Sequence, residues 1–199
     1  GAPTVNAAGT RVYVGAYDQH VSAFDAVDGT LRWTSEPSQL ALGSVRATVA
    51  VLGTRVYVPT LAHGLAALND GGTYVQYPWN QPLTGSLTGS SAVVPTSGLA
   101  SATIYVVDDA GRLLAIEDRV TDGHIMWTQP LGGRAAASAS FADNRVFAGV
   151  EDGTLRAFDA GDINGQLQVA LSATPIVDGS PSLFHGLAAV TTADGNLKV

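Results

Sequence analysis

The sequence contains no cysteine and a single lysine, Lys198, among its 199 residues. Without cysteine the chain can form no disulfide, thiolate metal site, cysteine nucleophile or thioether-linked haem. The net charge is −7, because 17 Asp and Glu outnumber 10 Lys and Arg. Binding to a phosphate backbone depends on clustered Lys and Arg, so we exclude nucleic acid as a partner.

Long apolar runs are also missing. No stretch approaches the ~20 apolar residues that a membrane-spanning helix needs, so we expect no membrane insertion. No basic segment followed by an apolar one opens the chain, and we expect a signal peptide to have been removed or to lie outside this sequence. The 46% of hydrophobic residues and the 23 glycines instead indicate a globular fold with many turns.

What the chain does contain is an internal repeat. Its copies are TRVYVG (10–15), TRVYVP (54–59), TIYVVD (103–108), NRVFAG (144–149) and, more weakly, HGLAAV (185–190). A segment rich in Ala, Ser and Val precedes each copy, and two short segments follow most copies after Gly or Asp turns. Apolar residues alternate with a period of two, which is typical of β-strands. Each unit of about 40–50 residues therefore predicts four strands, named A to D here, as in a propeller blade.

A second pattern, A-x-D-x-x-x-G-x-x-x-W, lies inside these units. The copy with this spacing is Ala23, Asp25, Gly29 and Trp33. The third unit keeps Ala115, Glu117, Gly123 and Trp127 with two extra residues in the turn, and the fourth keeps Ala157, Asp159 and Gly165, with Val169 in the place of tryptophan. The second unit keeps Ala67 and Asn69 and then departs, with Tyr77 near the tryptophan position. The pattern resembles the tryptophan-docking motif of PQQ-like (quinoprotein-type) β-propeller repeats, and the resemblance covers essentially the whole chain.

We interpret this motif as a packing device, because function lies in sites added to a fold. The alanine is expected to leave room for an indole from the neighbouring blade. The carboxylate is expected to accept hydrogen bonds from turn N–H groups, and the glycine to supply the positive φ of the C–D turn. Trp33 and Trp127 would each bury ~150–250 Å² between blades.

The predicted fold is all-β, a single β-propeller domain of four-stranded antiparallel blades over residues 1–199. The expected blades cover 2–34, 46–79, 90–128, 137–171 and 179–199, the last one incomplete, so that about four and a half PQQ-like blades are present. Propellers of the family that the chain resembles usually close with seven or eight blades. We therefore expect a further chain segment, or a second copy in a homo-oligomer, to cover the open ends.

The resemblance implies that a ligand would lie near the axis, on the face formed by the B–C turns and the D–A connections. The residues there that we propose as ligand-binding are Arg46, Trp79, Asp108, Asp109 and Arg134. Each also has a structural interpretation: a loop anchor for the tryptophan, surface charges for the arginines and turn residues for the aspartates. The four histidines lack the spacing of a zinc site, and we predict no metal ligand and no catalytic residue.

The resemblance leaves alternative functions open. One is a non-catalytic scaffold of the bacterial cell envelope, periplasmic or extracellular, which binds a protein partner or senses a ligand through the loop face and needs no cofactor. Another is a fragment of an alcohol or sugar dehydrogenase that uses PQQ and Ca²⁺, since oxygen ligands suit calcium and an aspartate can act as general base. A hydrolase or a lectin on a similar propeller is a third. The acidic composition and the lack of a clear ligand set favour the scaffold.

Overall fold

A computed structural model gives the fold of residues 1–36, 38, 43–62, 64–96, 102–135, 138–161, 166–170, 175–176, 180–184 and 187–199, with the backbone alone for 166–170. The elements with defined bounds are β-strands, and they form antiparallel sheets in which strands follow one another in chain order. This confirms the predicted all-β class. No described helix is long and apolar enough to cross a membrane.

Each sheet is one propeller blade; the strands of the first four correspond to the predicted A to D, and those of the fifth to A to C. Blade 1 contains β1 (Thr4–Val5), β2 (Arg11–Gly15), β3 (Val21–Asp25) and β4 (Leu31–Thr34). Blade 2 contains β5 (Ala50–Leu52), β6 (Arg55–Thr60), β7 (Gly64–Asp70) and β8 (Val75–Gln81). Blade 3 contains β9 (Ala92–Pro95), β10 (Ala102–Asp108), β11 (Arg112–Asp118) and β12 (Gly123–Pro130).

Blades 4 and 5 complete the chain. Blade 4 contains β13 (Ser140–Ala142), β14 (Arg145–Gly149), β15 (Thr154–Asp159) and β16 (Gln166–Ala170). Blade 5 contains β17 (Ser182–Phe184), β18 (Leu187–Thr191) and β19 (Leu197–Lys198). Strands β8 and β12 end at Gln81 and Pro130, beyond the limits of 79 and 128 expected for their blades.

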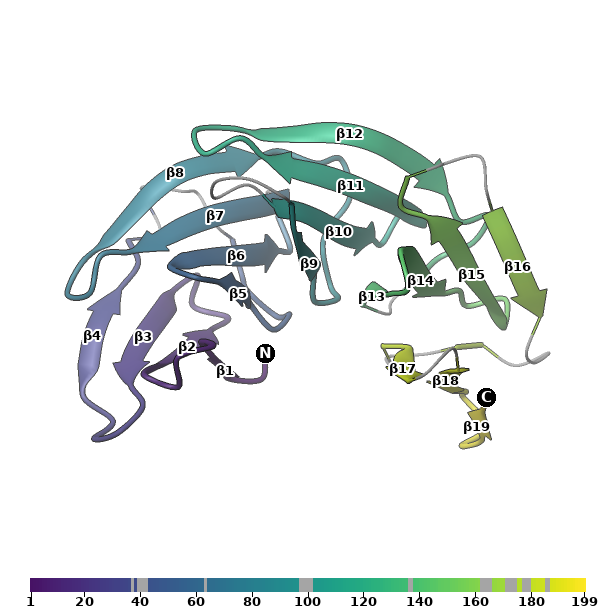
Figure 1. Ribbon diagram of the computed structural model, residues 1–199, viewed down its shortest axis with the longest axis horizontal. Coiled ribbons are helices and arrows are strands. Elements are labelled where there is room, and N and C mark those ends of the chain that lie inside the picture. The colour runs from purple at the N-terminus through teal and green to yellow at the C-terminus, as the bar shows by residue number, and fades with distance from the viewer. Residues whose placement is uncertain are drawn as a thin grey trace.

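The blades stand side by side in an open arc (Figure 1). The short strands β1, β5, β9, β13 and β17 lie on the concave side, where each contacts the next. The long strands β8 and β12 lie on the convex side, and the two chain termini lie at opposite ends of the arc. The concave side is therefore the propeller axis, and each described blade contributes its innermost strand to it.

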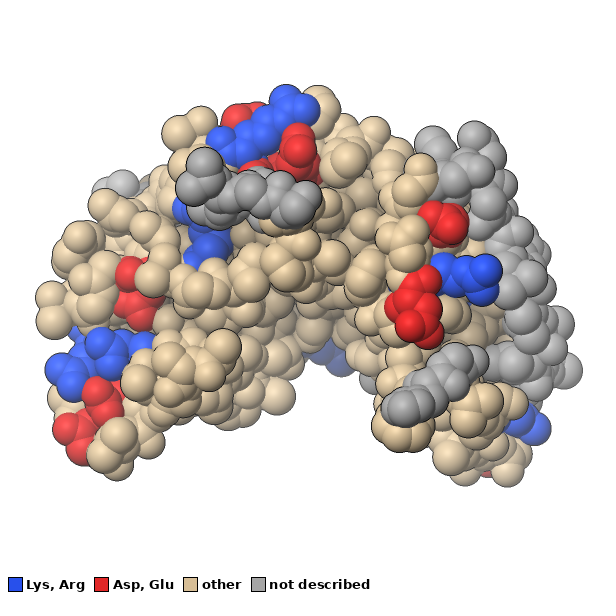
Figure 2. Space-filling view, in the orientation of Figure 1, with Lys and Arg blue, Asp and Glu red and all other residues tan. Residues whose placement is uncertain are grey.

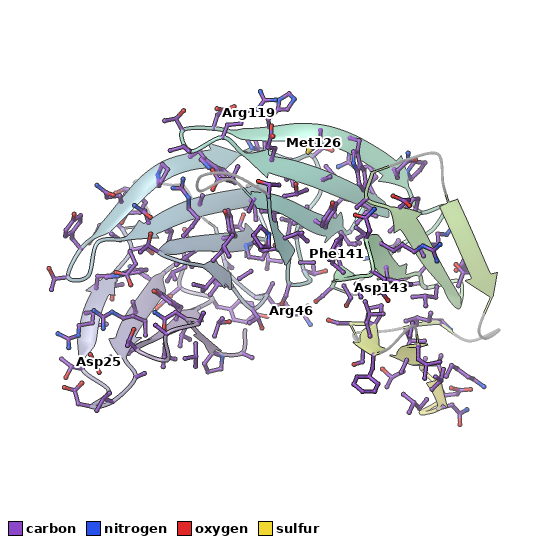
Figure 3. The ribbon with its side chains drawn as sticks, viewed as in Figure 1. Asp25, Arg46, Arg119, Met126, Phe141 and Asp143 are labelled. Carbon is purple, nitrogen blue, oxygen red and sulfur yellow. The ribbon has the colours of Figure 1, made fainter. Side chains whose placement is uncertain are left out.

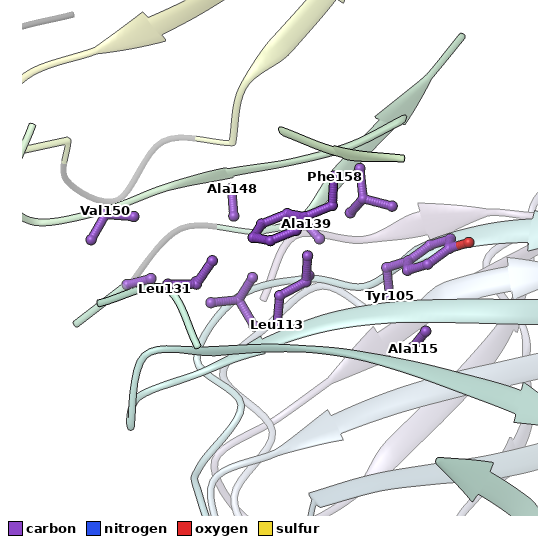
Figure 4. Close-up of a cluster of buried hydrophobic side chains, with 11 residues drawn as sticks. Tyr105, Leu113, Ala115, Leu131, Ala139, Ala148, Val150 and Phe158 are labelled. Atoms are coloured by element: carbon purple, nitrogen blue, oxygen red, sulfur yellow. The ribbon is translucent and has the colours of Figure 1, made fainter. Parts of the chain in front are cut away.

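Hydrophobic clusters join each blade to the next. One cluster lies between blades 1 and 2, a second between blades 2 and 3, and a third between blades 3 and 4, where Leu113 and Tyr105 face Ala148 and Phe158 (Figure 4). Every residue of β10 is buried, because a central blade packs on both of its faces. A smaller cluster around Ile176 and Val190 joins blades 4 and 5.

Candidate functional site

The connections between blades are tied to the B–C turns on both sides of them. In the first connection, Val45 N–H donates to the carbonyl of Ala16 in blade 1, and the Ser44 carbonyl accepts from Leu61 N–H in blade 2. Equivalent bonds recur in later connections: Leu87 N–H to Thr60 O, Asp109 N–H to Ser86 O, Glu151 N–H to Arg134 O, Ile176 N–H to Val150 O and Ala193 N–H to Pro175 O. The turns and connections thus form one continuous surface, called the loop face below.

A short pattern in each connection explains this geometry. The segments SVRAT (44–48), SLTGS (86–90) and RAAAS (134–138) align, and their second residues Val45, Leu87 and Ala135 are almost fully buried. This apolar residue anchors the connection, and the described residues next to it in the sequence are partly or fully exposed. Arg134 stands immediately before an anchor and Arg46 immediately after one, and both side chains are exposed.

The last residue of this pattern links the blades near the axis. Ala2 N–H donates to Thr48 Oγ1 at 3.1 Å, Thr48 N–H donates to Ser90 Oγ at 3.0 Å, and Ser90 N–H donates to Ser138 Oγ at 2.7 Å. Each backbone donor is thereby satisfied by a hydroxyl of the next blade. We call Thr48, Ser90 and Ser138 the hydroxyl ladder. Sequence reasoning noted that the innermost segments are rich in small residues but missed this ladder, although the recurring Ser or Thr was visible.

These features converge on one concavity of about 520 Å³, which we call the axial pocket. Its lining comprises Gly1, Ala2, Arg46, Ala47, Thr48, Thr88, Gly89, Ser90, Asp109, Arg134, Ala135, Ser138, Glu151 and Ser180. Figure 3 shows Arg46 on the concave side of the arc. Of the five residues predicted to bind a ligand, the structure brings Arg46, Asp109 and Arg134 together here. Glu151 and the hydroxyl ladder join them without having been predicted.

Asp108 does not line this pocket, although it was grouped with Asp109. Its side chain is fully buried and accepts from the backbone N–H of Arg112 at 3.0 Å and from Arg112 Nε at 2.9 Å. Gly85 packs against it so closely that a Cβ there would lie 2.7 Å from Asp108 Oδ2. These contacts fit the structural interpretation, in which Asp108 closes the turn between β10 and β11.

The prediction that Trp79 lies in a connection on the loop face is wrong. Trp79 belongs to β8, pairs with Ala67 across the sheet, and is 6% exposed. Its Nε1–H donates to Asp118 Oδ1 at 2.9 Å, so Trp79 is the docking tryptophan of blade 2. Tyr77 does not take that role. Ala67 and Trp79 lie two residues further apart in the sequence than Ala23 and Trp33, and counting along the sequence therefore missed the register.

The docking contact itself joins consecutive blades. Trp33 Nε1–H donates to Asp70 Oδ1 at 2.8 Å, and Tyr13 Oη–H donates to Asp70 Oδ2 at 2.7 Å. In the same way Tyr57 Oη–H donates to Asp118 Oδ2 at 2.8 Å. Each indole lies opposite the alanine of its own blade, as Ala23 and Trp33 do, and not opposite an alanine of the neighbouring blade as expected. Asp70 and Asp118 were missed because they follow the acidic position of the motif by one residue.

The remaining motif residues have mixed outcomes. Asp25 and Asp159 accept backbone N–H groups of Val27 and Gly161, as predicted for the acidic position, whereas Glu117 pairs with Arg119. The positive φ predicted for the glycine occurs at Gly29. At Gly123 the reason is close packing, since a Cβ would lie 2.8 Å from the Trp79 ring.

In blade 4 the residue opposite Ala157 is Leu167, not Val169 as the spacing implied. Gly165 lies outside the described residues.

The buried docking groups shift in pKa. Burial alone would raise the pKa of Asp70, but the hydrogen bonds from Tyr13, Trp33 and the Gly72 N–H, together with the charge of Arg11, lower it below its usual value. Burial, followed by the hydrogen bond to the aspartate, raises the pKa of Tyr13 and of Tyr57. Tyr13 and Tyr57 therefore stay neutral donors, and Asp70 stays a charged acceptor.

Most of the arginines are paired with carboxylates. Arg11, Arg32, Arg55, Arg112, Arg119 and Arg156 each form an ion pair with an Asp or Glu. Figure 2 shows basic and acidic side chains next to one another in mixed groups. Within the described part of the chain, no cluster of three or more His, Asp or Glu could hold a metal ion.

Meandering four-stranded sheets around an axis, joined by tryptophan–aspartate contacts, define the class of the protein: a β-propeller of PQQ-like repeats. Within that class, the model of the family described as outer membrane protein assembly factor BamB matches residues 1–92 and 76–198. The chain belongs to this family. No curated protein matches it.

Solved structures share the fold. BamB from Moraxella catarrhalis has a TM-score of 0.71 and 18% sequence identity, over 98% of this chain and 56% of that one. The computationally designed Ika8 protein has a TM-score of 0.63 and 12% identity, over 98% of this chain and 69% of that one. The chain thus spans little more than half the length of the Moraxella protein, and the likeness concerns the fold.

Proposed function

We propose that this protein is a non-catalytic binding scaffold of the bacterial cell envelope and that it contacts a protein partner through its loop face. The observation that carries the proposal is the match of the BamB family model along both halves of the chain. The name of that family describes an assembly factor for outer membrane proteins, a role in which one protein binds another.

The geometry of the loop face supports this function. The connections are fixed to the B–C turns by backbone hydrogen bonds and anchored by buried apolar residues. A surface held in this way loses little conformational entropy on binding, which favours affinity. It also carries exposed side chains, such as Tyr17 in the turn between β2 and β3, and tyrosine is a frequent anchor in protein interfaces.

A photo-crosslinking experiment tests the proposal. Benzoylphenylalanine would replace Tyr17 on the loop face or, as a matched control, Tyr74 in the turn between β7 and β8 on the opposite face; these tyrosines are 64% and 56% exposed. After irradiation in the envelope fraction of the bacterium that encodes the protein, we expect a discrete protein adduct at residue 17 and none at residue 74. An adduct at residue 74 alone would contradict the proposal, as would dye-linked alcohol oxidation by the chain reconstituted with PQQ and Ca²⁺.

A further inference from the structure

The arginines of the chain divide into two groups. Six of the nine are paired with a carboxylate of the same chain, as given above. Among the described residues, Arg46, Arg134 and Arg145 have no such partner. Two of these three, Arg46 and Arg134, line the axial pocket. In an acidic protein that pairs most of its arginines, two unpaired guanidinium groups in one concavity form a prepared site for an anion.

The backbone that carries both arginines is held in place. Val45 and Ala135 anchor the two connections, and the Arg134 carbonyl accepts from Glu151 N–H at 2.9 Å. The hydroxyl ladder joins the same two connections through Ser90, since Thr48 and Ser138 both belong to it. A guanidinium group presents a planar fork of donors that matches the two oxygens of a carboxylate. The ladder and Thr88 add hydroxyl groups to the same wall.

The acidic residues of the pocket narrow the choice of anion. Asp109 and Glu151 line it together with the arginines, so the formal charges of these four side chains cancel. Asp109 Oδ1 also accepts from Ser86 N–H at 2.9 Å, which fixes this carboxylate in the wall. A ligand with closely spaced negative charges would be repelled by these two groups. An isolated carboxylate carries a single charge and is repelled less by these two groups, while it still pairs with a guanidinium group.

We infer that the axial pocket binds an isolated carboxylate, carried by an acidic side chain of the partner protein, through Arg46 and Arg134. This inference rests on the proposed scaffold function and specifies the chemistry of its partner. A free small dicarboxylate has the same chemistry and is the alternative source. The pocket then acts as the point where the loop face fixes the position of the partner segment.

Fluorescence anisotropy with a labelled peptide of three Gly-Ser-Glu repeats tests the inference. We expect the peptide to bind the wild-type chain, to bind the double variant Arg46→Gln, Arg134→Gln at least about tenfold more weakly, and to lose affinity as salt is added. A peptide with Gln in place of Glu should not bind. Arg145→Gln is the matched control, because it removes one unpaired arginine from outside the pocket and should leave binding unchanged.

Further binding measurements distinguish an acidic side chain of a partner protein from a free dicarboxylate as the source of the carboxylate. Succinate should compete only weakly with the peptide; binding of succinate without binding of the peptide would overturn the assignment to a partner protein. A peptide with three consecutive Glu should bind less well than the spaced one, and Glu151→Gln should reduce that difference. Equal loss in the Arg145→Gln variant, or full binding by the double variant, would overturn the inference.

The crosslinking experiment distinguishes failure of this inference from failure of the scaffold proposal. If the Tyr17 adduct forms equally well in the double variant, the loop face binds its partner without the two arginines, and only this inference is wrong. If no adduct forms at residue 17 in the wild-type chain, the scaffold proposal itself is wrong.

Discussion

The interface between blades 2 and 3 and the interface between blades 3 and 4 begin with the same aromatic pair and then differ in chemistry. Tyr57 and Trp79 have ring centroids 6.2 Å apart, and Tyr105 and Trp127 have theirs 5.9 Å apart, at similar angles. In the first interface both rings donate to Asp118, which also pairs with Arg55 at 2.9 Å. In the second, Ala160 stands at the aspartate position and Thr103 at the arginine position.

The interface without the aspartate gains an aromatic ring. Phe141 stacks on Tyr105 with centroids 5.7 Å apart and planes 6° apart, whereas Val51 and Val93 hold the equivalent place in blades 2 and 3. Burial raises the pKa of Tyr105, as it does for the other two tyrosines, but without an aspartate among the causes. One repeat can therefore join its neighbours either through a buried carboxylate or through an added aromatic contact.

Removing the Asp118 carboxylate should have the largest effect on the stability of the protein. Asp118→Ala leaves Arg55, Tyr57 and Trp79 without their shared acceptor, and we expect a loss of about 3–5 kcal/mol in the free energy of unfolding. Asp70→Ala should cost less, about 1–3 kcal/mol, because its contact with Arg11 is longer, at 3.7 Å. Urea unfolding followed by tryptophan fluorescence measures both.

The control for this substitution is the neighbouring carboxylate. Within the part of the chain that the structure describes, Glu117 pairs only with Arg119, in a partly exposed site. Glu117→Ala should therefore change the free energy of unfolding by about 0–1 kcal/mol. Similar losses in Asp118→Ala and Glu117→Ala would show that the buried acceptor is not what stabilises the interface.

Loss of the Phe141 ring should destabilise the interface between blades 3 and 4. Phe141→Val gives blade 4 the residue type found in blades 2 and 3, but the interface between blades 3 and 4 has no aspartate to compensate. We expect a loss of about 1–2 kcal/mol in the free energy of unfolding, because the substitution leaves a cavity. The reciprocal Val93→Phe should also destabilise, because that interface is already filled. Unfolding of the two variants under identical conditions measures both effects, and a stabilising Val93→Phe would contradict the view that the two solutions are exclusive.

The sequence was sufficient to predict the fold because it repeats. Four copies of one strand pair, with period-two alternation and a tryptophan motif, define the blades and their order. Arg46, Asp109 and Arg134 could be placed on the loop face for the same reason.

The sequence was insufficient where register and long-range contacts decide the outcome. Trp79 follows its paired alanine, Ala67, by two residues more than Trp33 follows Ala23, so Trp79 was assigned to a connection. Asp70 and Asp118 act on the preceding blade, 37 and 39 residues from their tryptophans, and no local pattern identifies such partners. The hydroxyl ladder likewise depends on contacts between blades.

A smaller difference lies within the two polar interfaces. Two residues after the docking aspartate, blade 2 has Gly72 with φ of 92° and blade 3 has Val120 with φ of 74°. A β-branched residue is strained there, and Val120 is held by Asp118 and by Arg55 Nη2. A Cβ at Gly72 would meet nothing within 4 Å, so Gly72→Val should add backbone strain without a clash. The lower chain entropy of the unfolded state offsets part of this strain, and we expect a net loss of about 1–2 kcal/mol.

The reverse change should give the opposite sign. Val120→Gly removes the strain but adds chain entropy to the unfolded state, and we expect a net gain of about 1 kcal/mol or less. Thermal unfolding of the two variants measures the pair. A destabilised Val120→Gly would show that the contacts of the Val120 side chain outweigh the strain.

Acid should have the smallest effect, and it should weaken the interface between blades 1 and 2 through protonation of Asp70. The folded-state pKa of Asp70 lies below the usual value of 3.8, although burial opposes this, because Tyr13, Trp33, the Gly72 N–H and Arg11 all favour the charged form. Its stabilising contribution is therefore present above that usual value and is lost as the pH falls through the folded-state pKa.

Protonation of Asp70 keeps its side chain in place, so the loss of stability in acid should be smaller than in Asp70→Ala. We expect Asp70→Asn to be less stable than wild type near about pH 6 and the gap to narrow below about pH 4, as measured by urea unfolding. Ala160 cannot titrate, so the interface between blades 3 and 4 should contribute nothing to this pH dependence. If the difference in stability between wild type and Asp70→Asn stayed constant into strong acid, the charge of Asp70 would not be what joins blades 1 and 2.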